Sequence, residues 1–159
     1  MAMVNLFPEA DYDFDSLVVD ANEEQEERVG YKQSVYFDFE QGDFVRTGAN
    51  RLVASSGFDA WKQWCIKCLQ TQRYAHLAYS TDYGIDYELV FNYTTRSEAE
   101  NELTRQITEA LEADPYQRLD HIESISFEWI DDTSLTVDLI LVGISGNTIE
   151  LQQTLKAAA

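Results

Sequence analysis

Basic residues are scarce in this chain of 159 residues, which has 11 Lys and Arg against 29 Asp and Glu and a formal net charge of -18 at pH 7. Proteins that bind nucleic acid or anionic membrane surfaces use Lys and Arg to neutralise phosphates. A surface of this charge would repel double-stranded DNA. We therefore expect neither nucleic acid nor a membrane among the partners.

Long hydrophobic runs are missing as well. No stretch approaches the roughly 20 apolar residues of a membrane-spanning helix. The first residues, Met1 to Pro8, have neither the basic start nor the apolar core of a secretory signal peptide. We expect a protein that is made in a cytoplasm and carries no signal peptide.

Cysteine is limited to Cys65 and Cys68, which lie in the string Trp64-Cys65-Ile66-Lys67-Cys68. A W-C-x-x-C string is a local signature of thioredoxin-like oxidoreductases, whose thiolate is stabilised at a helix N-terminus. Here both cysteines fall about two turns inside a predicted helix, on its apolar stripe. Packing in a core is the favoured interpretation, because free cysteine is usually a small buried hydrophobe.

Other catalytic patterns are missing or carry little information. Zinc would need two further ligands, and His76 and His121 lack the spacing of a zinc ribbon or finger. Neither phosphate-binding glycine motif is present. With so many acids, a carboxylate pair for glycoside hydrolysis cannot be singled out. We predict no catalytic residue, metal, cofactor or small-molecule substrate, and a solvated helix face for Glu98, Glu100, Glu102, Glu109 and Glu112.

What the chain does contain is enough for one folded domain. Its hydrophobic content is 45%, and a chain of this length buries roughly 70% of its unfolded surface around a single core. The acids gather early, since residues 1-44 hold twelve Asp or Glu against Arg28 and Lys32. We interpret residues 1-30 as a partly ordered acidic arm and residues 31-159 as the domain.

Two segments have helical periodicity. From Gly57 to about Gln72 the apolar residues recur every three or four positions, as on the buried face of an amphipathic helix. A second helix is predicted from Ser97 to Leu111. There Ser97 and Glu100 have the spacing of a capping box, and Asp114-Pro115 ends the helix.

Other segments alternate apolar and polar residues, as strands do. Residues 31-47 predict a hairpin that turns at Glu40-Gln41-Gly42-Asp43. Residues 125-129 and 135-141 predict a second hairpin, and a last strand follows residues 143-147. The expected fold is a single α+β domain with a largely antiparallel or mixed sheet of about four to five strands packed against two main helices.

Three segments in order carry a resemblance to a known family. The first is Thr71-Gln72-Arg73-Tyr74 followed by Ala78 to Gly84, the second is the helix that closes on Asp114-Pro115, and the third is Leu135 to Leu139 with the final strand. Together they cover about residues 33-155. The chain resembles the short baseplate wedge proteins of contractile-tailed phages, once labelled tail lysozyme, in the branch found in phages and prophages of Gram-positive bacteria.

The loop of the first segment suits an architectural role. Gly84 fits a turn that needs a positive φ or a close backbone approach. The planar guanidinium of Arg73 has five donors with which to fix the loop in place. The residues assigned to this structural loop are Arg73, Tyr74, Tyr79, Asp82, Tyr83 and Gly84.

The resemblance also implies a contact site for partners. In the wider family the second helix ends in a Glu-Pro-Arg signature that is implied to contact neighbouring wedge subunits. This chain has Asp114, Pro115 and Tyr116 at those positions, and Arg118 is the nearest guanidinium. Either Arg118 substitutes for the missing arginine or this branch uses Tyr116 at the interface.

The family resemblance further implies a non-enzymatic structural subunit of the virion, assembled in the bacterial host cytoplasm. It implies six copies per baseplate, contacts with larger wedge proteins and the tail sheath protein, and a sheet edge at which the sheath begins by strand addition. The acidic arm is then either a docking segment for a basic neighbour or a solubilising tail. The alternatives are a small acidic adaptor or regulator with the same fold, and, less favoured, a glycosidase or a thiol oxidoreductase.

Overall fold

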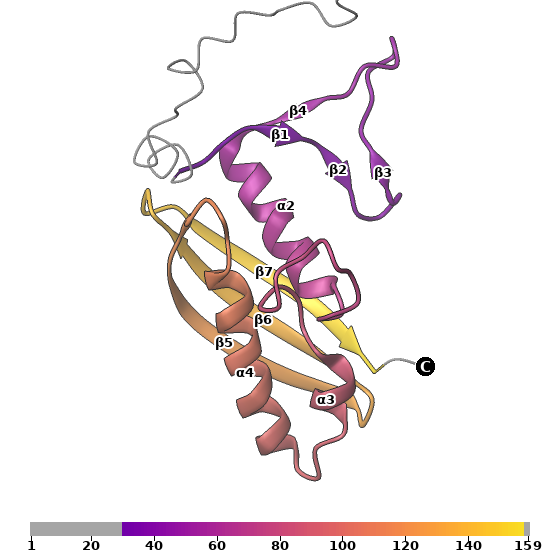
Figure 1. Cartoon of the computed structure of the whole chain (residues 1–159), viewed down its shortest axis with the longest axis vertical. Coiled ribbons are helices and arrows are strands. Elements are labelled where there is room, and N and C mark those ends of the chain that lie inside the picture. Colours follow the sequence, from indigo (N-terminus) through magenta and orange to yellow (C-terminus); the bar gives the residue numbers. More distant parts are fainter. Residues whose placement is uncertain (1–29, 158–159) are drawn as a thin grey trace, which may run out of the picture.

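The computed structural model describes residues 30–157, within which the chain forms three helices and seven strands (Figure 1). The predicted α+β class is confirmed. The predicted acidic arm, residues 1-30, lies outside the described residues except for Gly30. The elements are β1 (Ser34–Val35), β2 (Phe37–Asp38), β3 (Asp43–Phe44), β4 (Ala54–Ser55), α2 (Gly57–Gln70), α3 (Tyr87–Phe91), α4 (Arg96–Glu112), β5 (Leu119–Asp131), β6 (Ser134–Gly143) and β7 (Thr148–Lys156).

The main sheet is antiparallel and three-stranded, with β6 between β5 and β7. Burial alternates along β6, so that Leu135, Val137, Leu139 and Leu141 form one buried row. The strands predicted around residues 125-129, 135-141 and 149-151 are therefore confirmed. At the first turn the Asp131 carboxylate accepts a hydrogen bond from the Thr133 backbone N–H at 2.7 Å.

Helices α2 and α4 cover one face of this sheet (Figure 1). The Ser56 side chain caps α2 by accepting from the Asp59 N–H at 3.1 Å. The apolar stripe predicted for this helix is buried, and Trp61 at its centre has no exposed surface. Burial of such stripes is the main source of the domain's stability, at roughly 25 cal/mol per Å² of apolar area.

The capping box predicted for α4 is wrong by two residues. The N-cap is Thr95, whose side chain accepts from the Glu98 N–H, while the Glu98 carboxylate accepts from the Thr95 hydroxyl at 2.9 Å. Thr95 has the extended backbone that a cap requires. Glu100, two residues further on, accepts from the indole N–H of Trp129 at 2.8 Å and so ties α4 to β5.

Strands β1 to β4 are separate from the main sheet, whereas one sheet of four to five strands was expected. Strand β1 pairs with β4, and β2 pairs with β3. Between these ladders three backbone N–H groups form a ring, in which Tyr36 donates to Val53, Val53 to Val45 and Val45 to Tyr36, at 2.8 to 3.0 Å. We call residues 34–55 the β-junction. It lies beyond the N-terminal part of α2 (Figure 1).

The hairpin predicted over residues 31-47 is part of this β-junction. Phe37 pairs with Phe44 across the ladder, and Gly42 in the turn has a φ of 71°. The Phe37 N–H donates to the Gln63 side-chain oxygen at 2.6 Å, which fastens the β-junction to α2. A polar contact thus joins the β-junction to α2, while Phe37 packs edge-on against Phe39 and Phe44 within the β-junction.

Candidate functional site

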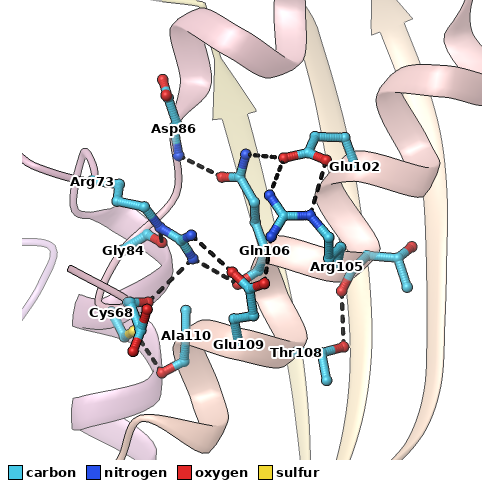
Figure 2. A network of polar contacts seen from close by, with 12 residues as sticks. Cys68, Arg73, Gly84, Asp86, Glu102, Arg105, Gln106, Thr108, Glu109 and Ala110 are labelled. Atoms are coloured by element: carbon cyan, nitrogen blue, oxygen red, sulfur yellow. Dashed lines mark hydrogen bonds and ion pairs between the residues drawn. The ribbon is translucent and has the colours of Figure 1, made fainter. Parts of the chain in front are cut away.

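Arg73 lies three residues after the end of α2 and is almost completely buried, with 5% of its surface exposed. Its Nε donates to the carbonyl of Gly84 at 2.9 Å, and one terminal nitrogen donates to the carbonyls of Asp82 and Gln106 at 3.1 and 3.2 Å. The other terminal nitrogen pairs with the Glu109 carboxylate at 3.0 Å (Figure 2). One guanidinium therefore holds the 73–84 loop against α4.

A second layer of contacts lies on α4 beside Arg73 (Figure 2). Arg105 is placed between two carboxylates and pairs with both Glu102 and Glu109. Gln106 is buried, and its side-chain oxygen accepts from the Asp86 backbone N–H at 2.7 Å while its amide donates to Glu102 at 2.8 Å. We call Arg73, Glu102, Arg105, Gln106 and Glu109 the Arg73 network. Glu100, Glu102 and Glu109 thus make internal contacts, although a solvated face was predicted for them.

The pKa values of both carboxylates respond to these contacts. The hydrogen bond from Arg73 holds the pKa of Glu109 below its usual value, and the hydrogen bond from Arg105 does the same for Glu102. A carboxyl group whose pKa is lowered by folding stabilises the fold above its unfolded pKa, and this stabilisation is lost as the pH falls through the folded pKa.

Replacement Glu109→Gln tests this linkage. We expect it to lower the free energy of unfolding by about 1 kcal/mol or less at neutral pH, since the side chain is partly exposed and solvent screens the pair. The difference from wild type should shrink as the pH falls from 4.5, the usual pKa of a glutamate, toward the lower folded value. Urea unfolding at a series of pH values measures it. Glu112→Gln on the same helix is the control, and equal effects of the two replacements would contradict the assignment.

Gly84 is fixed by two constraints at once. Its φ is +88°, a conformation that side chains rarely adopt. A Cβ at this position would lie 2.6 Å from the carbonyl oxygen of Thr71. The close approach arises because the Ile85 N–H donates to Thr71 and the Arg73 N–H donates to Ile85, both at 2.9 Å. Gly84 therefore has both the positive φ and the close backbone approach that the sequence suggested for it.

The remaining residues of the structural loop divide into a buried and an exposed set. Tyr83 is buried, and its ring stacks on that of Tyr79 with centroids 4.4 Å apart. Asp82 is exposed and contributes its backbone carbonyl to Arg73. Tyr74 has a φ of 66° and is 67% exposed, and Leu77 is fully exposed. The Arg73 network therefore displays a short apolar loop on the surface.

The turn between α4 and β5 is built on a buried ion pair. Asp114 and Arg118 form two parallel hydrogen bonds of 2.8 and 2.9 Å, and their side chains are 1% and 4% exposed. The same carboxylate accepts from the backbone N–H groups of Tyr116 and Arg118. The Arg118 guanidinium lies over the rings of Trp64 and Tyr116. Pro115 is exposed and Tyr116 half-buried at the tip of this turn.

The cysteines occupy the core rather than a reactive position. Cys65 and Cys68 are free and buried, as the sequence predicted. Burial raises the pKa of both thiols, to about 12 for Cys68, whose S–H also faces the carbonyl of Ala110. A reactive thiol needs the opposite shift, because the thiolate is the nucleophile. This setting disfavours thiol chemistry at neutral pH.

The main sheet has two outer edges of different character. The pairing of β5 with β6 has three register irregularities, whereas β7 pairs with β6 through nine consecutive residues without one. Irregular edges are a common protection against unwanted pairing, and regular edges accept strands more readily. Within residues 30–157 no strand pairs with the outer edge of β7.

Sequence reasoning singled out Arg73, Gly84, Asp114 and Arg118 but missed Gln106. A glutamine on an acidic helix gives little signal of its own. Its position offered one clue, because it directly precedes Ile107 on the apolar stripe and is therefore partly turned toward the core. Within residues 30–157 no cluster of three His, Cys, Asp or Glu could hold a metal ion, and no helix is long and apolar enough to cross a membrane.

A family model described as contractile injection system sheath initiator matches residues 33–146, which is more than two thirds of the 159-residue chain. The matched range contains the β-junction, the Arg73 network, the turn at Asp114 and the strands β5 and β6. No curated protein sequence matches the chain.

Proposed function

This chain belongs to the contractile injection system sheath initiator family, and from that premise we propose that it is a non-enzymatic subunit of a phage or phage-tail-like baseplate at which the tail sheath begins. Membership gives it a structural role in a contractile injection system. We place it in the virion, among larger wedge proteins and in six copies per baseplate. The family resemblance supports these finer assignments.

The observation that carries the proposal is the outer edge of β7. A strand added to a sheet gains affinity from main-chain hydrogen bonds, and the added strand needs a regular row of unpaired N–H and C=O groups. The regular pairing of β7 to β6 extends from Thr148 to Lys156. The exposed side chains of β7, including Gln152 and Thr154, are polar and alternate with buried apolar ones. We propose that a strand of the first sheath ring pairs here.

Omission of this chain tests the role in sheath assembly. Tail tubes and baseplates assembled without it are expected to remain unsheathed, while addition of the purified chain before the sheath protein should restore sheathed tails. Negative-stain electron microscopy counts sheathed particles. Normal sheath lengths in its absence would contradict the proposal, and so would its absence from purified particles by mass spectrometry.

For the wedge contact we propose that Pro115 and Tyr116 meet the partner while Asp114 and Arg118 hold the turn. The support is the burial of Asp114 and Arg118, since Arg118 donates from its Nε and one terminal nitrogen to the Asp114 carboxylate. Tyr116 is half-buried and lies beside the exposed Pro115, and tyrosine is enriched among residues that dominate interface energies. The assignment favours the tyrosine alternative over the arginine one.

Replacement Tyr116→Ala is expected to weaken the complex with the wedge proteins by about tenfold or more, because interface tyrosines often contribute 1.4 kcal/mol or more. Co-purification after co-expression measures the loss. Tyr93→Ala is the matched control, since Tyr93 is 39% exposed and lies before the opposite end of α4. Equal losses for the two variants, or no loss for Tyr116→Ala, would rule out this contact.

A further inference from the structure

A groove of about 670 Å³ lies between the β-junction and α2. Phe37, Phe39 and Phe44 line it on one side, and Trp64 and Lys67 of α2 line it on the other. Lys32, just before β1, also lines it. This volume is within the range of ligand pockets and holds several side chains. We call it the basic groove.

The charge of the basic groove is opposite to that of the chain. The described residues that line it include Lys32, Lys67 and Arg118 and no Asp or Glu, although acids outnumber bases in the chain by 29 to 11. Arg118 is neutralised by Asp114. Lys32 and Lys67 are exposed and have no carboxylate partner within residues 30–157. The groove thus offers aromatic walls and two lysine charges without a carboxylate partner among the described residues, of which Lys67 also lies over the ring of Tyr79.

A second groove, between α4 and β5, shows that this is not a general property of the surface. The described residues that line it include Glu112, Asp114, Asp120 and Glu123 and no Lys or Arg. A segment with apolar side chains flanked by carboxylates would be repelled there and attracted to the basic groove. An acidic segment would therefore bind in the basic groove rather than in the groove between α4 and β5.

Such a segment precedes the described residues in this chain. Residues 1–29 contain nine Asp or Glu against Arg28 alone. Within them the apolar run Leu17-Val18-Val19 and Phe14 are flanked by Asp13, Asp15 and Asp20. This pattern matches the groove, whose lining combines aromatic side chains with two lysines.

The point at which this segment joins the domain also fits. The Gly30 N–H donates to the carbonyl of Tyr116 at 3.1 Å, and Tyr116 is itself part of the groove lining. Nine residues separate Asp20 from Gly30, a length that reaches about 30 Å when extended. A tether of this length gives an effective concentration in the millimolar range. A second copy of the chain, by contrast, approaches against the repulsion of two like charges of -18.

We propose that the basic groove binds residues 13–20 of the same chain, with the apolar side chains on the aromatic walls and the carboxylates at Lys32 and Lys67. The segment then covers the aromatic face of the β-junction and lies next to Tyr116. A partner that approaches Tyr116 from this side has to displace it. This proposal does not depend on the assignment to a sheath or a baseplate.

Hydrogen exchange of the full chain tests the proposal. We expect the backbone amides of residues 14–19 to exchange at least about fivefold more slowly in wild type than in the double variant Lys32→Glu/Lys67→Glu. The protection should fall in 1 M salt, where the screening length is about 3 Å. Combining the double variant with Asp13→Lys/Asp15→Lys should restore it, because the charges are then exchanged rather than lost. Lys62→Glu, an exposed position of α2 outside the groove lining, is the control.

Three outcomes would overturn the proposal. The first is exchange of residues 14–19 at the rate of an unstructured peptide in wild type. The second is protection that is unchanged in Lys32→Glu/Lys67→Glu or equally reduced in Lys62→Glu. The third is protection that rises with protein concentration, which would identify a second copy as the occupant. Exchange in β6 reports that each variant is folded, since Lys32 and Lys67 are exposed and their replacement leaves the core intact.

Discussion

Proline at a residue of β7 whose N–H faces the open edge is expected to reduce sheath assembly strongly while leaving the domain folded. In an antiparallel ladder successive residues point their N–H groups alternately toward the neighbour and away from it. Of Gln152 and Gln153, one therefore donates toward β6 and the other toward the open edge. Proline at the outward position removes a donor for an added strand and places its ring in the way.

The expected loss of sheathed tails is about tenfold or more, because a lost main-chain hydrogen bond alone costs roughly 1 kcal/mol at each of several identical sites. The melting temperature should change little for this variant. Proline at the other position breaks a bond to β6 and should lower the free energy of unfolding by about 2 kcal/mol. The two proline variants control for each other, since both introduce the same residue in β7 and only one of them is expected to lose stability. If the variant that keeps the stability of wild type assembles normal sheaths, β7 is not the acceptor edge.

The largest loss of stability is expected for Gly84→Ala. The left-handed φ of +88° costs about 1 kcal/mol for a residue with a Cβ. The contact of 2.6 Å with the Thr71 oxygen requires the backbone to shift, and that shift strains the hydrogen bonds between Thr71, Arg73 and Ile85. We expect a total decrease of about 3 kcal/mol in the free energy of unfolding, at the upper end of single replacements.

Gly146→Ala separates the two causes of this loss. Gly146 also has a positive φ, of 79°, but a Cβ there would meet nothing within 4 Å. Its replacement should cost only the backbone strain, about 1 kcal/mol. Urea unfolding with equal m-values for both variants gives the difference. Equal costs for Gly84→Ala and Gly146→Ala would show that the close approach at Gly84 is relieved without breaking the loop.

The long helices and strands were predictable because the residues that they bury recur in the sequence with the period of the element. In α2 the stripe that includes Trp61 and Cys65 is the buried face of the helix. In β6 the alternation of Leu135, Val137, Leu139 and Leu141 is the alternation of the two faces of the sheet. These elements bury side chains on one side only, and the period of two or 3.6 residues follows from their geometry.

The short elements contain too few residues to show a period of apolar positions in the sequence. Strands β1 to β4 have two residues each, and their geometry depends on the backbone ring of Tyr36, Val45 and Val53 rather than on side chains. Helix α3, Tyr87–Phe91, is shorter than two turns and begins at an Asp86 cap. The cap of α4 was misplaced because Thr95 with Glu98 and Ser97 with Glu100 both have the required spacing. Only the backbone conformation distinguishes them.

Parts of the candidate site were predictable where the chemistry of a single residue type determines its structural role. The role of Gly84 follows from the lack of a Cβ and that of Arg73 from its planar fork. Which groups the fork meets was not predictable, since Gln106 and Glu109 are brought to it by the packing of α4. The same holds for Asp114 and Arg118, whose i,i+4 spacing allows a pair but does not require burial.

The most direct test of the account is a cryo-electron microscopy structure of the assembled particle at a resolution that separates strands. We predict a fourth strand, contributed by the sheath protein, about 4.8 Å from β7 and paired along Thr148–Lys156. The account is contradicted if the outer edge of β7 faces solvent or the tail tube while the first sheath ring contacts this chain elsewhere.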